Sequence, residues 1–281
     1  MGRKSDFIHD VGLTSKRRGG NPKTVSHRIM VGTIPANFFI ESKINLPRFV
    51  AQVKAEVLPQ FALYLMMHYS HPGTLQNKMG AVRSLLKAAR VDLKAFKSNC
   101  SVGIPSRSRG PGKLPFPDER LDQLYRDAAA KDEGLMHCLK LERLLSARGL
   151  EAVMSIKTLS SWLESASQSN EVAFTAGTKG GRPRVTELIA NKQEETIKAI
   201  HAAIYYAEKN GGVLIKGPAG TLKSARSLYH RLCREIGMVK PYSPHSLRYA
   251  YCVDKIVELL DIGYTMPEAC RDDLPPIPVP I

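Results

Sequence analysis

The sequence predicts a mainly α-helical protein with one small β-hairpin, organised as two helical regions joined by a linker. Apolar residues recur at spacings of three and four along most of residues 45–98, and again beyond residue 118, as in helices that bury one face. Two short β-prone segments flank Gly180-Gly181, which is a typical hairpin signal. Residues 99–118 show no such periodicity, so they separate the two regions.

The composition is that of a globular protein. The chain has 281 residues, enough for two ordinary domains with substantial cores, and 43% of them are hydrophobic and 24% charged. No apolar run approaches the length of a membrane span, and the polar N-terminus lacks the apolar segment of a signal peptide, so we expect no membrane contact. The five cysteines are scattered and odd in number, which predicts reduced thiols in a cytoplasmic protein and no metal site.

Positive charge is the strongest compositional signal. The formal net charge of +15 favours a polyanionic partner and predicts binding to double-stranded DNA. Many basic proteins bind nothing specific, so charge alone leaves the partner open. Residues 1–28 contain seven Lys or Arg against two Asp and little apolar material, and residues 1–44 are therefore expected to form a flexible basic arm.

Residues 45–98 are predicted to form a helical N-terminal DNA-binding domain. One helix runs from residue 45 to about residue 69, where Pro59 should kink or divide it, and a second covers residues 74–90. The second helix carries a basic stripe opposite its apolar side, formed by Lys78, Arg83, Lys87 and Arg90. Such a stripe can face DNA phosphates, or it can be an ordinary solvated face, and the sequence leaves both interpretations open.

Residues 99–118 are the predicted linker, and they contain Arg107 and Arg109 as further candidates for DNA contact. A connection of this length would let two domains close around a duplex. Residues 119–281 form a second predicted domain that is mostly helical. Its expected helices are 118–130, 134–147, 150–166, 193–210, 221–237 and one that starts at Ser243, and its expected strands are 171–176, 184–188 and 213–216.

The last of these helices begins with features of an anion site. Ser243 is suited to cap it, and Pro244 to occupy its first position, where a missing N–H costs nothing. His245 and Arg248 are three residues apart in the first turn and share one face. A helix N-terminus with these two side chains suits a phosphate. A capped helix end with a surface histidine and arginine remains the alternative.

Residues 217–224 resemble a phosphate-binding P-loop but depart from it at one position. Leu222 stands where the loop needs a glycine, whose missing Cβ lets the backbone wrap around a phosphate. The sequence also lacks an acidic magnesium ligand after a buried strand. We therefore predict a turn that caps the following helix, and nucleotide binding by Gly217–Ser224 is a remote alternative.

Three separated segments occur in an informative order. They are Arg148-Gly149-Leu150-Glu151-Ala152-Val153, Gly177-Thr178-Lys179-Gly180-Gly181-Arg182-Pro183-Arg184 and Ser243-Pro244-His245-Ser246-Leu247-Arg248-Tyr249-Ala250. Together they resemble the catalytic domain of the tyrosine recombinases, the phage-integrase family, and most closely the proteobacterial prophage integrases. The resemblance covers about residues 70–270, so that residues 119–281 would be the catalytic domain. Each segment alone is weak, whereas the three in this order are specific.

The resemblance implies a site-specific recombinase that cleaves and rejoins DNA strands through a phosphotyrosyl intermediate, without a cofactor and as a tetramer on DNA. Arg148 and Arg248 would hold the phosphate oxygens that gain charge in the transition state. Lys179, on the hairpin, would protonate the leaving 5′ oxygen, and His245 would supply a hydrogen bond or transfer a proton. Glu151 would orient Arg148.

The end of the sequence departs from the family pattern. The family has a Gly-His pair and then a short helix with the nucleophilic tyrosine, whereas this chain runs Ile262-Gly263-Tyr264 and has four prolines in its last seven residues. Tyr249, Tyr251 and Tyr264 follow Arg248, and none stands at the family position. We therefore expect a truncated or frameshifted integrase that binds DNA but lacks its nucleophile. An active recombinase and an inactive DNA-binding remnant remain the competing functions.

Overall fold

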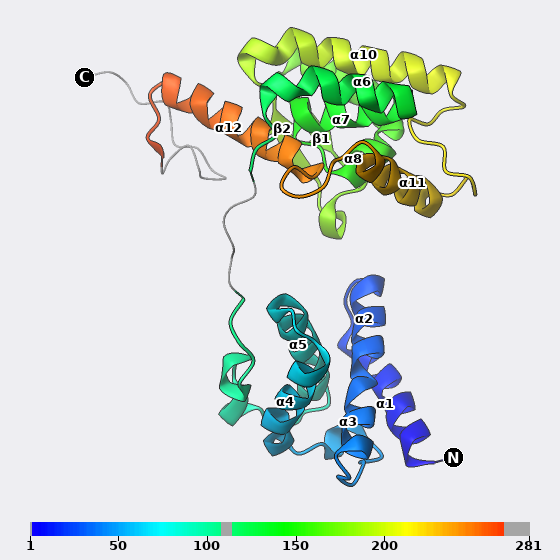
Figure 1. Ribbon diagram of the computed structural model, residues 1–281, viewed down its shortest axis with the longest axis vertical. Helices are drawn as coiled ribbons and strands as arrows, with labels where there is room; N and C mark the ends of the chain where they lie inside the picture. The colour runs from blue at the N-terminus through cyan, green and yellow to red at the C-terminus, as the bar shows by residue number, and fades with distance from the viewer. Residues whose placement is uncertain (1, 108–113, 267–281) are drawn as a thin grey trace. The chain divides into compact units, whose positions relative to one another are not determined.

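The computed structural model describes residues 2–107 and 114–266, whose helices and strands are shown in Figure 1. The chain divides into two compact units, Met1–Pro111 and Gly112–Ile281, and each is described by itself. The division falls inside the segment 99–118 that the sequence marks as a linker.

Two expectations fall outside the described residues. One concerns Arg109 as a DNA contact, and the other concerns the proline-rich residues 267–281. Within the described ranges, no helix is both long and apolar enough to cross a lipid bilayer.

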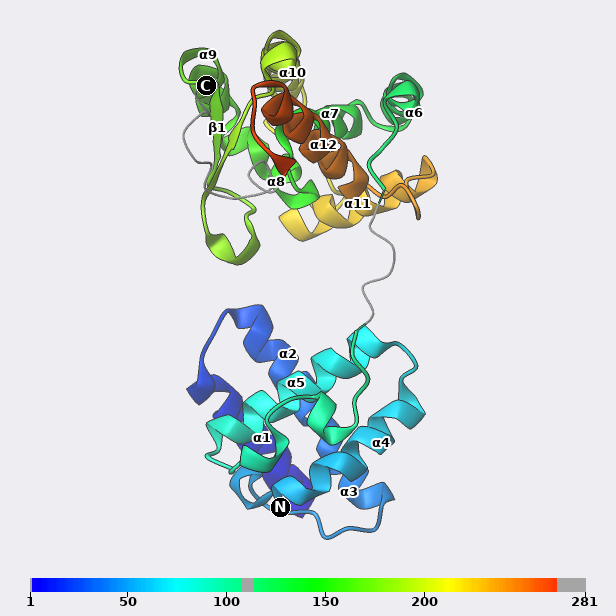
Figure 2. The ribbon, with the colours of Figure 1, turned by 90° about the vertical axis from the view of Figure 1, so that its left-hand side faces the viewer.

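The N-terminal unit is an assembly of short helices around one core. Its helices are α1 Arg3–Arg18, α2 Pro22–Gly32, α3 Ile34–Glu41, α4 Leu58–His68 and α5 Pro72–Ala88. α1 packs on both α2 and α5, and α3 contacts α1, α2 and α4 (Figure 2). In the core, the rings of Phe38 and Phe61 meet edge-on with centroids 5.4 Å apart.

The structure corrects the expectation of a flexible basic arm over residues 1–44. α1 buries Phe7 and Val11, which are 1% and 0% exposed and lie four residues apart on one side of the helix. Arg28 of α2 is also buried, and its guanidinium donates to the Ser15 main-chain oxygen at 2.9 Å. The basic composition concealed this packing, because a helix needs few apolar residues when they share one face.

Pro59 begins a helix instead of dividing one. α4 starts at Leu58 and has Pro59 in its first turn, where the missing N–H of proline costs no hydrogen bond. Residues 45–57, predicted as the first half of a long helix, contain two short 3-10 turns. α5 corresponds to the predicted helix over residues 74–90, although Arg90 lies beyond its end with a left-handed φ of 63°.

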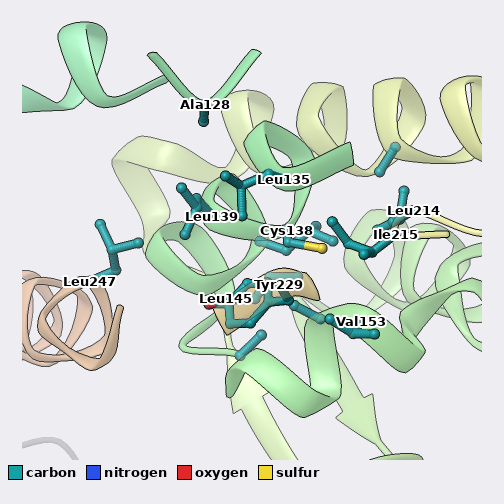
Figure 3. Packing of buried hydrophobic residues seen from close by; sticks show 14 of the residues in the cluster. Ala128, Leu135, Cys138, Leu139, Leu145, Val153, Leu214, Ile215, Tyr229 and Leu247 are labelled. Carbon is teal, nitrogen blue, oxygen red and sulfur yellow. The ribbon is translucent and has the colours of Figure 1, made fainter. Parts of the chain in front are cut away.

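α7 is the central helix of the C-terminal unit. The helices of this unit are α6 Leu121–Lys131, α7 Glu133–Leu145, α8 Gly149–Met154, α9 Leu159–Gln168, α10 Gln193–Lys209, α11 Leu222–Glu235 and α12 His245–Asp261, and its strands are β1 Glu171–Phe174 and β2 Arg184–Glu187. α7 contacts α6, α8, α10, α11 and α12. Figure 3 shows its residues Leu135, Cys138 and Leu139 in the core, close to Tyr229 of α11.

β1 and β2 form the predicted hairpin as a two-stranded antiparallel sheet. Phe174 lies opposite Arg184 in its register. The turn between the strands contains Gly180 with φ 76°, a left-handed conformation that suits glycine. The third predicted strand, at residues 213–216, is wrong: this stretch is a loop that buries Leu214 and Ile215, and it belongs to no sheet among the described residues. The predicted fold class, mainly helical with one small sheet, is confirmed.

Candidate phosphate-binding site

Arg148 stands immediately before α8, after a left-handed turn at Ser146 (φ 52°) that ends α7. The Glu151 carboxylate accepts a hydrogen bond from the Arg148 main-chain N–H at 2.7 Å, so the two residues together cap the N-terminus of α8. The same carboxylate accepts a second hydrogen bond from Arg148 Nη1 at 2.6 Å. Glu151 thereby fixes the direction of the Arg148 side chain, which is 37% exposed.

Arg184 of β2 binds the same carboxylate. Its Nη2 donates to Glu151 Oε2 at 2.6 Å, and its Nε donates to Oε1 at 3.3 Å. Glu151 is 0% exposed, and a buried charge without partners would be strongly destabilising. Burial alone would raise the pKa of Glu151, but hydrogen bonds from Arg184 and Arg148 hold it below its usual value. The carboxylate is therefore ionised at neutral pH.

α12 begins at His245, where the sequence predicts a helix start, but without the predicted side-chain cap. No side chain caps this helix; instead, the Ser246 N–H donates to the Ser243 main-chain oxygen at 2.7 Å. His245 and Arg248 both lie in the first turn. The half-buried His245 ring meets the Tyr249 ring edge-on, with centroids 5.0 Å apart.

Two arginines share the main-chain oxygen of Ser146 as an acceptor. Arg248 Nη1 donates to this oxygen, and Arg184 Nη2 donates to it at 2.7 Å. Burial lowers the pKa of Arg248, and the nearby charges of Arg184 and Arg148 lower it further. Arg148 and Arg184 bind the Glu151 carboxylate, and Arg248 lies close enough to feel its charge, so three guanidinium groups near one carboxylate leave an excess of positive charge that suits an anion.

Comparison with known families decides the assignment. The sequence matches the family described as Integrase over residues 103–254, which is more than half of the chain. The chain belongs to the integrase family. The matched range contains the three arginines of the cluster. A search of curated proteins finds no match.

One solved structure resembles the integrase weakly. It is titled "Crystal structure of XerA recombinase", and it is 14% identical in sequence over 93% of this chain and 85% of that chain. The TM-score is 0.32, which is too low to show a common fold.

Lys179 of the integrase lies at the exposed tip of the hairpin. Among the described residues, no hydrogen bond or ion pair joins it to the arginine cluster. Gly180 and Gly181 follow it with φ values of 76° and 73°, so the tip has a backbone path that other residues rarely adopt. The structure brings Arg148 and Arg248 close enough for their charges to interact, whereas Lys179 makes no hydrogen bond or ion pair with either among the described residues.

No sequence pattern predicted a role for Arg184. The available signal was its place in β2, opposite the buried Phe174, where its guanidinium carbon lies 3.9 Å from the ring centroid. Charged residues on the buried side of a strand are rare unless they are paired. Its partner Glu151 is 33 residues away in the sequence, so the pairing becomes visible only in the folded chain.

A second buried pair lies where α8 packs on α11. The Tyr229 hydroxyl donates to Glu142 of α7, which is 1% exposed. Burial raises the pKa of Glu142 to about 8, although the Tyr229 hydrogen bond and the charge of Arg248 oppose the rise. A Cβ on Gly149 would lie 2.8 Å from the Tyr229 ring, so glycine is what allows α8 to approach α11 this closely.

The basic stripe predicted on α5 is only partly available to DNA. Arg83 donates to the Phe96 main-chain oxygen at 2.7 Å and to Asn99 Oδ1 at 3.1 Å, so it holds the segment that follows α5. Lys78 Nζ lies 4.2 Å from the centre of the Tyr69 ring. The remaining described candidates, Lys87, Arg90 and Arg107, are exposed.

α11 presents a basic surface that the sequence motifs did not reveal. One side of the helix buries Tyr229 and Leu232 in the core. The exposed residues include four cations, Lys223, Arg226, Arg231 and Arg234. Their spacing of three to five residues, opposite an apolar side, is the sequence signal that could have identified them. α11 packs on α8, the helix that starts next to Arg148.

The loop at residues 217–224 caps α11. Thr221 Oγ1 accepts a hydrogen bond from the Ser224 N–H at 3.2 Å, and Ser224 Oγ accepts one from the Ala219 N–H at 3.2 Å. A Cβ on Gly217 would lie 2.3 Å from the main-chain nitrogen of Ala225, so the loop is pressed against the helix. The loop borders a mainly apolar cavity of about 350 Å³. This geometry favours the predicted cap over the P-loop alternative, because donors of the loop are used within it.

Proposed function

We propose that this integrase is a site-specific DNA recombinase that holds one phosphodiester of duplex DNA between Arg148 and Arg248. The observation that carries the proposal is the cluster of three arginines around the ionised Glu151. Arg148 and Arg248 each use only Nη1 in side-chain hydrogen bonds with the described residues, which leaves the other terminal nitrogen of each, Nη2, for a phosphate oxygen; Nε of Arg248 is buried. The resemblance of three segments to prophage integrases supports a mobile element as the origin of the protein.

The chemistry follows from charge. Displacement at a phosphodiester passes through a five-coordinate phosphorus whose non-bridging oxygens gain negative charge. Guanidinium groups that are already fixed stabilise this charge without rearranging during the reaction. The N-terminus of α12, next to Arg248, adds a partial positive charge of its own.

Lys179 and His245 complete the proposed reaction. A lysine ammonium at the exposed hairpin tip can reach the leaving 5′ oxygen once DNA is bound, and it can donate a proton there. His245, one turn before Arg248, supplies a hydrogen bond or transfers a proton. Both roles are carried over from the recombinases by resemblance.

We further propose that none of the described tyrosines after Arg248 is the nucleophile. The Tyr251 hydroxyl donates to the Glu187 main-chain oxygen at 2.5 Å, and burial raises its pKa, so both effects oppose its ionisation. Tyr264 is only 7% exposed, and Tyr249 is half-buried in the first turn of α12. A DNA-binding protein that forms no covalent bond is therefore the second candidate function.

Gel assays with the full-length protein separate these functions. The substrate is a nicked version of the duplex that the protein selects from random-sequence DNA. We expect a retarded band on native gels and no covalent protein–DNA band on denaturing gels. A covalent band abolished by Tyr249→Phe or Tyr264→Phe, but kept by the control Tyr205→Phe on α10, would identify the nucleophile and overturn the second proposal. Failure to select or retard any duplex would overturn the recombinase proposal itself.

A further inference from the structure

We propose that Arg184 positions both of the arginines that hold the phosphate, an inference that rests on the proposed function. Arg184 is bound to the carboxylate of Glu151, which orients Arg148. It is also bound to the main-chain oxygen of Ser146, which receives Arg248. Across the part of the chain that the structure describes, Arg184 alone is hydrogen-bonded to both of these acceptors.

Few donors of Arg184 remain for a ligand. An arginine side chain has five N–H groups, and four hydrogen bonds from Arg184 reach acceptors of the protein. Its Nε and Nη2 donate to Glu151, Nη2 also donates to the Ser146 oxygen, and Nη1 donates to Thr186 Oγ1 at 2.5 Å. Arg148 and Arg248 each make one such side-chain bond. Most N–H donors of Arg184 are therefore used within the protein, whereas Arg148 and Arg248 keep donors that can bind a phosphate.

The hairpin anchors Arg184. Its guanidinium carbon lies 3.9 Å from the centroid of the Phe174 ring, its neighbour across the two strands, and its side chain is 22% exposed. The same hairpin carries Lys179 at its tip. Arg184 thus joins β2 to Glu151 of α8 and to Ser146 at the end of α7, the residue whose oxygen Arg248 of α12 also binds, and in this way it sets the two arginines in position relative to the hairpin.

Arg184 acts through geometry as well as charge. A planar guanidinium can bridge a carboxylate and a carbonyl oxygen at once, whereas a lysine ammonium is a single point charge. Arg184→Lys therefore keeps the net charge but loses the bridge. A side chain that merely attracted phosphate would be largely replaced by lysine.

A double-mutant cycle on DNA affinity tests this role. The full-length protein is titrated at fixed salt with the labelled duplex that the wild type selects from random-sequence DNA. Arg184→Lys and Arg148→Gln should each weaken binding about tenfold, and the double variant should also weaken it about tenfold, because both changes disrupt one arrangement. Arg182→Gln is the matched control, because Arg182 is an exposed arginine of the same hairpin. The loss of DNA affinity caused by Arg182→Gln should multiply with the loss caused by Arg148→Gln when the two changes are combined.

Thermal unfolding of each variant separates positioning from stability. A purely structural role would lower the unfolding temperature but leave the two effects on DNA affinity multiplicative. If Arg184→Lys does not fold, Thr186→Val replaces it, with a loss of about threefold that should likewise vanish in the Arg148→Gln background. Wild-type affinity of Arg184→Lys, or multiplicative losses in either cycle, would overturn the inference and leave the proposed function intact. A wild-type protein that selects no duplex would overturn the proposed function and this inference with it.

Discussion

Two buried glutamates of the integrase have opposite protonation states because their partners differ. Glu151 receives hydrogen bonds from Arg148 and Arg184, and its pKa is lowered. Glu142 receives one from the neutral Tyr229, and burial raises its pKa to about 8. At neutral pH the first carboxylate is therefore ionised and holds the arginines, whereas the second is largely protonated.

Glu142 makes stability depend on pH in a definite direction. Its pKa is about 8 in the folded protein, against a usual value of 4.5, so between these values the folded state binds more protons and stability falls as pH rises. Glu142→Gln keeps an acceptor for the Tyr229 hydroxyl but cannot ionise. The variant should lose this decline, which we expect to be on the order of 3 kcal/mol between about pH 5 and pH 8. Urea unfolding across this range measures it.

An exposed glutamate provides the control for this experiment. Glu208→Gln on α10 should follow the wild-type curve. Burial lowers the pKa of His137 and His230, which adds stability as pH rises, but these residues are common to all three proteins and cancel in the differences. A decline that persists unchanged in Glu142→Gln would show that another group carries it.

At the scale of elements, the sequence predicted features that depend on neighbouring residues, such as helix starts and turns. Pro244, predicted as the first helical residue, directly precedes α12, which begins one residue later at His245, and the hairpin follows from Gly180-Gly181. The pairing of Arg184 with Glu151 could not be predicted, because it joins residues 33 apart that only the packed fold brings together. The same holds for α1, whose basic composition predicted an arm while the spacing of its few apolar residues fitted a core helix.

The burial of α1 leads to a clear prediction for the N-terminal unit. Phe7→Ala removes a side chain that is 1% exposed, and it should cost about 3–5 kcal/mol of unfolding free energy in this unit. Leu13→Ala on the same helix is the control, since Leu13 is 46% exposed and its loss should cost less than about 1 kcal/mol. Urea unfolding followed by circular dichroism measures both. Equal unfolding free energies of the two variants would contradict the burial of α1 and support the original expectation of a flexible arm.

At the scale of the whole molecule, most of the net charge of +15 belongs to the N-terminal unit, but both units expose cations. The N-terminal unit exposes Lys87 and Arg90 near the end of α5, and the C-terminal unit exposes cations such as Arg226 and Arg234 along α11. Each phosphate that such a group neutralises releases counterions from DNA, so affinity for duplex DNA should fall steeply with salt. The slope of log affinity against log salt gives the number of Lys and Arg side chains that contact phosphates.

The salt dependence gives a test of the α11 surface in particular. If Arg226 and Arg234 contact phosphates, the double variant Arg226→Gln/Arg234→Gln should reduce the slope of log affinity against log salt by about 2, because each contact contributes about 0.9. Lys198→Gln/Lys209→Gln on α10 removes the same net charge from another helix and should lower affinity slightly without changing the slope. Fluorescence anisotropy at several salt concentrations measures both. Identical slopes for the two double variants would mean that α11 contributes only to the general field of the protein and that phosphate contacts lie elsewhere.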